Sequence, residues 1–161
     1  MASPVFFIKK KDRSLHLVQD YQKLNAMTMN NSYPLPLIPD ILNKVSEAKA
    51  QYFTKLDIHW GYNNVRIKEG DEWKATSWTN RGLFEPLFMF FGLTNSPATF
   101  QTMMNDIYKD LIDEGVMTIY MDDILIFGSQ MKEQHHTIVV KVPDILWMHR
   151  LYLKVEKCIF E

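Results

Sequence analysis

Cysteine, net charge and long apolar runs are all scarce in this sequence of 161 residues, and each scarcity excludes a class of protein. Cys158 is the single cysteine, which excludes a disulfide framework and a metal cage built from several thiolates. The formal net charge is −1, so the composition gives no indication of polyanion binding. The longest apolar run, residues 87–93, is too short to span a bilayer, and no signal peptide opens the chain. We therefore expect an intracellular protein without a membrane segment.

Apolar and aromatic residues are plentiful, at 47% and 13% of the sequence. This composition is typical of a globular protein with a hydrophobic core and argues against disorder. A chain of this length forms about one domain. The sequence contains no internal repeat, no low-complexity tract and no clear linker.

Two adjacent acids, Asp122 and Asp123, stand between two short apolar, β-branched runs at residues 116–119 and 124–127. This pattern predicts a β-hairpin whose tip carries two carboxylates. Asp is also a common turn residue for purely local reasons, and that interpretation stays open for the pair alone. However, two carboxylates about 4 Å apart repel by roughly 4 kcal/mol at an effective dielectric constant of 20. Such repulsion favours a bound cation nearby.

Asp57 is the candidate for a third acid, because it ends the strand-like run at residues 52–58. A lone Asp at a strand end is more often a turn or capping residue, and this alternative also stays open. Elsewhere, alternation predicts a hairpin over residues 4–18 and two strands at 73–79 and 83–91 around a turn at 80–82.

A helix is predicted to begin at Ser96, the expected N-cap, and Pro97, and to continue to Leu111 with a Met-rich apolar stripe that packs in the core. A second helix follows the acidic hairpin. Pro143 lies within its pattern, so we expect this helix to kink or restart there. None of the five histidines is assigned to catalysis, and His135 and His136 are expected on a solvated helix face.

Several motifs occur together in a fixed order. They are Asp20-Tyr21 with Leu24-Asn25, Tyr33-Pro34-Leu35-Pro36, Leu56-Asp57 with Gly61-Tyr62, residues 91–101 (FGLTNSPATFQ), Tyr120-Met121-Asp122-Asp123, and residues 151–158 (LYLKVEKC). In this combination the sequence resembles the reverse transcriptases of gypsy-class long-terminal-repeat retrotransposons, which are related to the retroviral enzymes. The resemblance extends over nearly the whole chain, and it is highly specific because so many motifs agree in order.

The resemblance implies an α+β fold, the finger–palm core of a right-hand polymerase, in which an antiparallel sheet packs on helices and the thumb is absent. Residues 1–33 and 65–91 would form partial fingers, and residues 34–64 and 92–161 would form the palm. The rest of a Pol polyprotein, with thumb, connection and ribonuclease H, is expected in a full-length relative. The family also implies a location in a cytoplasmic particle or the nucleus.

The implied activity is RNA-directed DNA synthesis, in which a primer 3′-hydroxyl attacks the α-phosphate of a deoxynucleoside triphosphate on an RNA or DNA template. By similarity, Asp57, Asp122 and Asp123 would be catalytic and would bind two Mg²⁺ ions, with Mn²⁺ as a possible substitute. The Ile58 carbonyl would add a metal ligand. Carboxylates and substrate phosphates suit Mg²⁺, which prefers oxygen ligands.

Residues of the nucleotide site also follow from the resemblance. Lys10 would meet the triphosphate, Tyr62 would be the steric gate against a ribose 2′-hydroxyl, and Phe91 and Gly92 would line the nucleotide pocket. Tyr120 and Met121 would lie near the primer terminus. For Tyr62, ordinary core packing is the alternative.

Some residues depart from the family pattern. His16 and Gln22 stand where arginines are usual, Gln19 replaces an apolar residue, and Ser77 stands in place of a phenylalanine. Loss of a permanent cation at His16 would forfeit a charge-assisted contact of about 1.5–3 kcal/mol. The alternative function is therefore a weak or inactive retrotransposon remnant with a palm-like fold.

Overall fold

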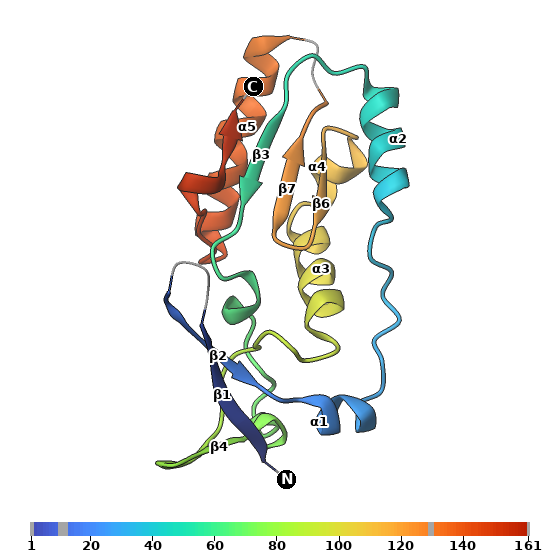
Figure 1. Cartoon of the computed structure of the whole chain (residues 1–161). Coiled ribbons are helices and arrows are strands. Elements are labelled where there is room, and N and C mark those ends of the chain that lie inside the picture. The colour runs from blue at the N-terminus through green and yellow to red at the C-terminus, as the bar shows by residue number, and fades with distance from the viewer. Residues whose placement is uncertain (1, 10–12, 129–130, 161) are drawn as a thin grey trace. The chain divides into compact units, whose positions relative to one another are not determined.

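The protein, seen as a computed structural model, is described over residues 2–9, 13–128 and 131–160 (Figure 1). It divides into two compact units: residues 1–31 with 62–96, and residues 32–61 with 97–161. Each unit contains one four-stranded sheet, in the order β2-β1-β4-β5 in the first and β6-β7-β3-β8 in the second.

The first unit is built on the hairpin of β1 (Ser3–Lys9) and β2 (Leu15–Gln19), which confirms the hairpin predicted for residues 4–18. β1 also pairs in parallel with β4 (Ser77–Thr79), which forms an antiparallel hairpin with β5 (Gly82–Phe84). The helix α1 (Gln22–Met27) follows β2, and short 3₁₀ turns cover Gly61–Asn64 and Glu72–Ala75.

Two strand predictions in this unit are too long. Residues 72–75 form a 3₁₀ turn rather than the start of a strand, and β5 ends at Phe84 instead of reaching residue 91. Pro86 follows closely, and proline has no N–H with which to extend a sheet. The predicted turn is confirmed, since Thr79 pairs with Gly82 across it.

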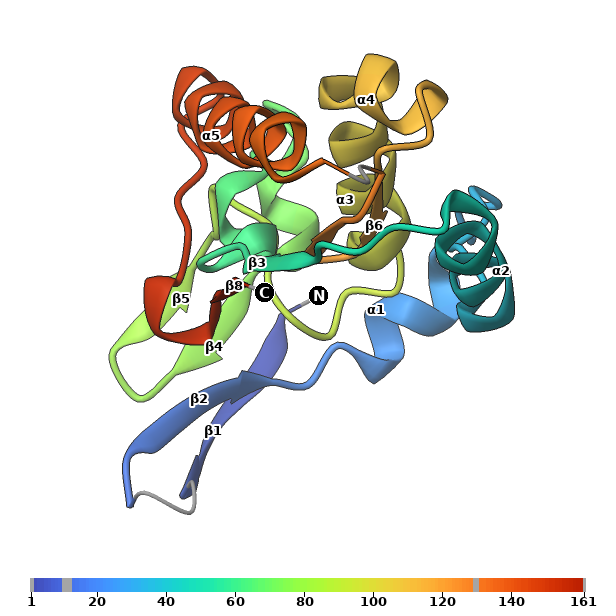
Figure 2. The same cartoon turned by 90° about the horizontal axis from the view of Figure 1, so that it is seen from above.

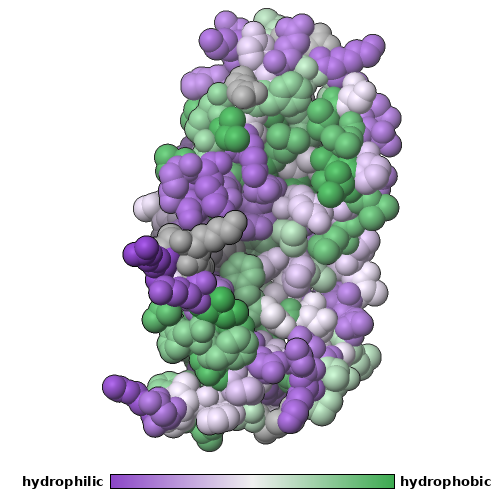
Figure 3. Space-filling view, viewed as in Figure 1, coloured by the Kyte–Doolittle hydropathy of each residue, from purple (hydrophilic) through white to green (hydrophobic). Residues whose placement is uncertain are grey.

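Apolar side chains reach the surface of the molecule at many places (Figure 3). On the first hairpin, Phe7 lies opposite Leu17, and the two side chains are 64% and 44% exposed. Such a cross-strand pair stabilises a hairpin locally, by about 0.2–1 kcal/mol. The pair therefore contributes to the hairpin itself, and only to a small extent to a core.

The second unit holds the larger core. Its sheet consists of β6 (Met117–Tyr120), β7 (Asp123–Ile126), β3 (Thr54–Asp57) and β8 (Ile159–Phe160), and all its pairings are antiparallel. The helices α3 (Ser96–Ile107), α4 (Lys109–Asp113) and α5 (Lys132–Met148) lie on one face of this sheet (Figures 1 and 2). The helix α2 (Ile38–Ala48) and a 3₁₀ turn at Val155–Lys157 complete the unit. The predicted α+β class is confirmed.

The apolar stripe predicted for residues 98–111 forms the centre of this core. Phe100 and Met104 are fully buried on α3, and Leu111 is buried on α4. The helix begins at Ser96 itself, and its hydroxyl donates to the Phe90 carbonyl instead of capping the helix. Tyr108, between the two helices, donates its hydroxyl to the Val142 carbonyl on α5 at 2.7 Å.

Pro143 lies inside α5, which is one helix over Lys132–Met148. The expected restart at this residue is therefore wrong. Val142 and Leu146 are buried on either side of it, so packing of this face against the core holds the helix together despite the missing N–H. In the described ranges, no helix combines the length and the apolar character needed to cross a membrane.

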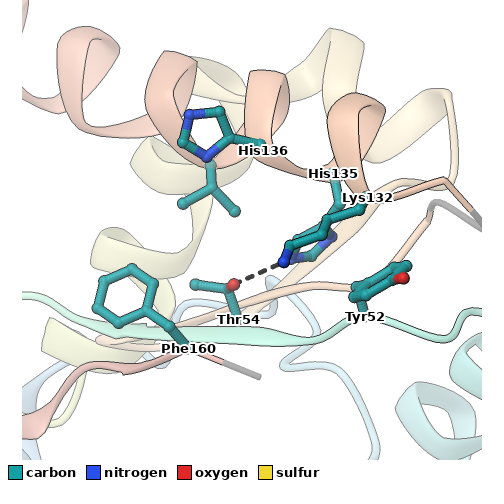
Figure 4. A pocket seen from close by; sticks show the side chains of 7 residues that line it. Tyr52, Thr54, Lys132, His135, His136 and Phe160 are labelled. Carbon is teal, nitrogen blue, oxygen red and sulfur yellow. Dashed lines mark hydrogen bonds between the residues drawn. The ribbon is translucent and has the colours of Figure 1, made fainter.

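The expectation that His135 is solvated is also wrong. Its side chain is only 6% exposed, and Nε2 lies 2.9 Å from the Thr54 hydroxyl of β3. It lines a pocket of about 340 Å³ with Tyr52, Lys132 and Phe160 (Figure 4). Burial lowers the pKa of His135 below its ordinary value. The sequence pattern of α5 failed to predict this because His135 takes an inward position beside a tertiary partner, Thr54, which lies far away in the sequence.

We expect Pro143→Ala to stabilise the protein. A proline in a helix interior costs about 3 kcal/mol relative to alanine, and part of this is recovered when the Val139 carbonyl gains a backbone donor. The free energy of unfolding in urea should rise by about 1–3 kcal/mol. Lys141→Ala, an exposed position on the same helix, is the control and should change stability little. A Pro143→Ala variant no more stable than the wild type would contradict the prediction.

Candidate active site

Asp57 occupies the last position of β3, where the strand's alternation places it on the same face as Lys55. Leu56 points to the opposite face and is fully buried, which fixes the orientation of the strand. The Asp57 side chain is itself nearly buried, with the residue 5% exposed. The main chain here is held as well, because the Asp57 carbonyl accepts the Lys154 N–H at 2.8 Å.

The predicted acidic hairpin is confirmed: β6 and β7 pair with Tyr120 opposite Asp123. Met121 and Asp122 form the two-residue turn between them. Two-residue hairpin loops need a positive φ at their first residue, a position usually taken by Gly or Asn. Met121 has this conformation, at φ 53°. The apolar residues Ile119 and Ile124 are buried beneath the turn and anchor both strands.

The register of β3 on β7 places Asp57 directly opposite Asp123. The Ile58 N–H donates to the Asp122 carbonyl at 2.8 Å, so the neighbouring Asp57–Asp123 pair occupies a position without ladder hydrogen bonds. In such pairs the Cα atoms are about 4.5 Å apart and the side chains are close. The three acids predicted from the sequence therefore meet at one end of the sheet, although 65 residues separate Asp57 from Asp122.

Two lysines, which sequence reasoning missed, pair with these acids. Lys157 Nζ lies 3.1 Å from Asp57 Oδ2, and Lys55 Nζ lies 3.0 Å from Asp123 Oδ1. The hydrogen bond and charge of Asp57 raise the pKa of Lys157. Lys55 lies two residues before Asp57, so strand alternation places both side chains on the same face. This spacing could have predicted that Lys55 lies beside the acids. No comparable signal placed Lys157, which lies 100 residues further along the chain.

The environment of Asp122 disfavours its charge. Burial raises the pKa of this carboxyl, and the negative charges of Asp123 and Asp57 raise it further, against lowering effects from its own backbone and Lys157. A divalent cation would relieve this repulsion. Carboxylate oxygens are suitable ligands for Mg²⁺, so the donor set fits the predicted ions. Within the described ranges, however, no three His, Cys, Asp or Glu side chains converge closely enough to enclose one ion.

Tyr62, Phe91 and Gly92, three of the four residues predicted for the nucleotide site, lie close together within the first unit. The Tyr62 and Phe91 rings meet edge to face, with centroids 4.8 Å apart. Tyr62 is buried, whereas Phe91 is 57% exposed. Gly92 has φ 98°, a conformation that favours glycine. Its carbonyl accepts the Asn25 amide at 2.7 Å, and Asn25 in turn accepts the Thr94 N–H. Lys10 lies outside the described residues.

Comparison with known proteins decides the family. Residues 8–161 match the family model described as reverse transcriptase (RNA-dependent DNA polymerase). The chain belongs to the reverse transcriptase family. It is 39% identical over 159 residues to the Transposon Tf2-3 polyprotein of Schizosaccharomyces pombe, and 38% identical to the Tf2-7 polyprotein. These matches cover 99% of this chain but only 12% of each relative. The resemblance to gypsy-class retrotransposon enzymes is confirmed.

Solved structures agree with the reverse transcriptase fold. A foamy viral protease–reverse transcriptase in complex with double-stranded DNA superposes with a TM-score of 0.87 at 22% identity. The same enzyme in complex with an RNA/DNA hybrid gives 0.82 at 20% identity. Both cover 99% of this chain, and 27% and 21% of the viral chains.

Two of the residues expected to depart from the reverse transcriptase pattern are hydrogen-bonded to each other. The Gln19 amide donates to the Ser77 hydroxyl at 3.3 Å. Gln19 also accepts the Tyr21 hydroxyl at 2.7 Å. Burial raises the pKa of Tyr21 to about 12, so this phenol remains a donor at physiological pH. Ser77 therefore has a structural partner in Gln19. Nothing in the structure explains His16 or Gln22 in place of arginine.

The raised pKa of Asp122 predicts how stability depends on pH without metal. The folded state holds a proton on this carboxyl more strongly than the unfolded state does, so ionisation destabilises the fold as pH rises. In the presence of EDTA, Asp122→Asn should raise the melting temperature by a few degrees at pH 7. The difference should shrink as pH falls toward the ordinary pKa of Asp, because the wild-type side chain then becomes neutral too.

Thermal unfolding followed by circular dichroism between pH 4.5 and 7.5 measures this difference. Asp106→Asn, at an exposed position of α3, controls for the general loss of one negative charge. If Asp122→Asn were less stable than the wild type at pH 7 in EDTA, the repulsion inferred for this site would be wrong.

Proposed function

We propose that this chain is the catalytic core of an RNA-directed DNA polymerase, which adds deoxynucleotides to a primer 3′-hydroxyl by two-metal phosphoryl transfer. The observation that carries the proposal is the register of β3 on β7, which brings Asp57 opposite Asp123 with Asp122 in the adjoining turn. Asp57 is far in the sequence from the two adjacent acids of the hairpin, and like charges placed opposite one another destabilise a sheet, so this arrangement favours a bound cation.

In this proposal Asp57 and Asp122 hold two Mg²⁺ ions, Asp123 assists, and the Ile58 carbonyl adds a ligand. When bound, the ions lower the pKa of the primer hydroxyl and neutralise charge on the attacking and leaving oxygens. The protein contributes a rigid frame. Backbone hydrogen bonds on both edges of β3, from Ile58 to Asp122 and from Lys154 to Asp57, keep the carboxylates in place without substrate.

The nucleotide would contact the first unit. Tyr62 would stand where a ribose 2′-hydroxyl would clash with its ring, supported by the edge-to-face contact with Phe91. The Gly92 backbone, held by Asn25, would border the same pocket, and Lys10 would meet the triphosphate as a point charge. Tyr120 and Met121 would lie near the primer end.

The proposed partners are a primed RNA or DNA template and deoxynucleoside triphosphates. The solved relatives bound to an RNA/DNA hybrid and to double-stranded DNA support this class of ligand. Because the chain spans about an eighth of the polyproteins it matches, we propose that it works with the thumb, connection and ribonuclease H regions of such a polyprotein.

A non-catalytic palm-like protein is the second candidate, and one observation favours it. Lys157 and Lys55 already neutralise Asp57 and Asp123, so the acids have cationic partners that belong to the chain. In an enzyme, metal ions and substrate would have to displace these ammonium groups. In the second candidate the lysines would be permanent partners.

We expect Asp122→Asn to abolish primer extension while leaving the fold intact, because the amide cannot supply the negative charge that holds the ions. The assay is extension of a DNA primer on an RNA template, with and without Mg²⁺. The variant should fall to the level seen without metal, and circular dichroism should show unchanged secondary structure. Asp106→Asn is the matched control. Full activity of Asp122→Asn would refute its catalytic assignment, and an inactive wild type would favour the second candidate.

Sugar selectivity provides an independent test of Tyr62. Tyr62→Ala removes the ring and should admit ribonucleotides, so the ratio of deoxyribonucleotide to ribonucleotide incorporation should fall by at least about tenfold, the effect of roughly 1.4 kcal/mol. Tyr62→Phe keeps the ring and should keep the selectivity. Equal selectivity of Tyr62→Ala and the wild type would show that Tyr62 is an ordinary buried side chain.

A further inference from the structure

Gln101 is a polar side chain that the core of the second unit encloses completely. It lies on α3 and is 0% exposed. A buried amide must find partners at both ends, since an unpaired polar group in the interior is costly. Both ends of Gln101 are paired: Nε2 donates to the Ile119 carbonyl at 3.1 Å and to Asn105 Oδ1 at 3.0 Å, and Oε1 accepts the Met121 N–H at 2.8 Å.

Two of these three contacts lead to the acidic hairpin. Ile119 and Met121 lie on either side of Tyr120. The Gln101 side chain therefore hydrogen-bonds the hairpin backbone at two places, one just before the turn and one at the first residue of the turn. Met121 adopts φ 53°, a left-handed conformation that is unfavourable for a residue with a Cβ. The turn therefore depends on an external contact to hold Met121, and Gln101 supplies one directly to its N–H.

Packing alone does not require an amide at this position. A methionine or leucine fills a comparable volume without a polar group, and Phe100 and Met104 on the same helix are fully buried apolar residues. The directional contacts to the turn distinguish Gln101 from these neighbours.

We propose that Gln101 is a positioning residue that fixes the backbone of the Met121-Asp122 turn and thereby orients the Asp122 carboxylate. The inference rests on the proposed function, in which Asp122 binds metal. None of the three hydrogen bonds described for Gln101 goes to a carboxylate, so in this proposal Gln101 acts through the main chain of the hairpin. Asn105 supports it, since its Oδ1 accepts from the Gln101 amide and its own amide donates to the Tyr33 hydroxyl at 2.7 Å.

The decisive test is a double-mutant cycle between Gln101→Met and Met121→Gly. Gln101→Met removes the hydrogen bonds to the hairpin backbone. It should lower kcat for Mg²⁺-dependent extension by about tenfold, the effect of one lost hydrogen bond to a strained turn. The KM for deoxynucleotide should change much less. Glycine adopts positive φ without strain, so in the Met121→Gly background the same substitution should cost clearly less than tenfold. A purely structural role of Gln101 predicts the same loss in both backgrounds.

Two measurements do not depend on catalysis. Gln101→Met should accelerate hydrogen exchange of the Met121 amide, measured by NMR. It should also weaken the binding of Mn²⁺ alone, followed by paramagnetic broadening of signals from the hairpin. Thr102→Val is the matched control on the same helix: its hydroxyl bonds only within α3, to the Ala98 carbonyl, and this variant should change neither measurement. If Gln101→Met does not fold, Asn105→Ala loosens the same hydrogen bonds and should shift both measurements in the same direction to a smaller extent.

The proposal is overturned if the Met121 amide exchanges at the wild-type rate in these variants, or if Met121→Gly gives no rescue. These results can be distinguished from a failure of the proposed polymerase function itself. If the proposed function fails, the wild type will extend no primer. Hydrogen exchange of the Met121 amide will still report whether Gln101 holds the turn.

Discussion

The second unit has to hold two like charges opposite each other, Asp57 on β3 and Asp123 on β7. The rest of its structure depends on this constraint. Repulsion between the two carboxylates disfavours this pair, and Lys157 and Lys55 offset part of that repulsion. The pair persists because the opposite faces of both strands carry Leu56, Ile124 and Ile126, which are fully buried, so register is set by the core. A slip of one residue would expose these side chains and turn Asp57 inward. Hydrophobic packing thus holds the carboxylates together against their repulsion.

Much of this arrangement was accessible from the sequence. The β-branched runs around Asp122-Asp123 predicted the hairpin, and the stripe through Phe100, Met104 and Leu111 predicted the buried helix face. In both cases the signal is local, since strand and helix periodicity act over a few residues. The motif order added the meeting of Asp57 with the hairpin, which periodicity alone cannot give because it depends on pairing between distant strands.

The remaining features depend on contacts that a linear pattern does not carry. Lys157 reaches Asp57 through a long side chain from a separate 3₁₀ turn. The hydrogen bonds from Gln101 to the hairpin backbone depend on how α3 packs against the hairpin. His135 and Pro143 were misjudged for a related reason. The local pattern of α5 predicts a solvated His135 and a helix interrupted at Pro143. Tertiary contacts override both tendencies: Thr54 pairs with His135, and the buried Val142 and Leu146 hold the helix together at Pro143.

The contact between Gln19 and Ser77 has a consequence for evolution and for protein engineering. The two side chains are hydrogen-bonded across the sheet of the first unit. Substitution of Ser77 alone by phenylalanine would leave the Gln19 amide facing an aromatic ring. Substitution of Gln19 alone by an apolar residue would remove the donor to Ser77. A chimera with a related element would therefore have to carry residues 3–19 and 77–84 over from the same parent.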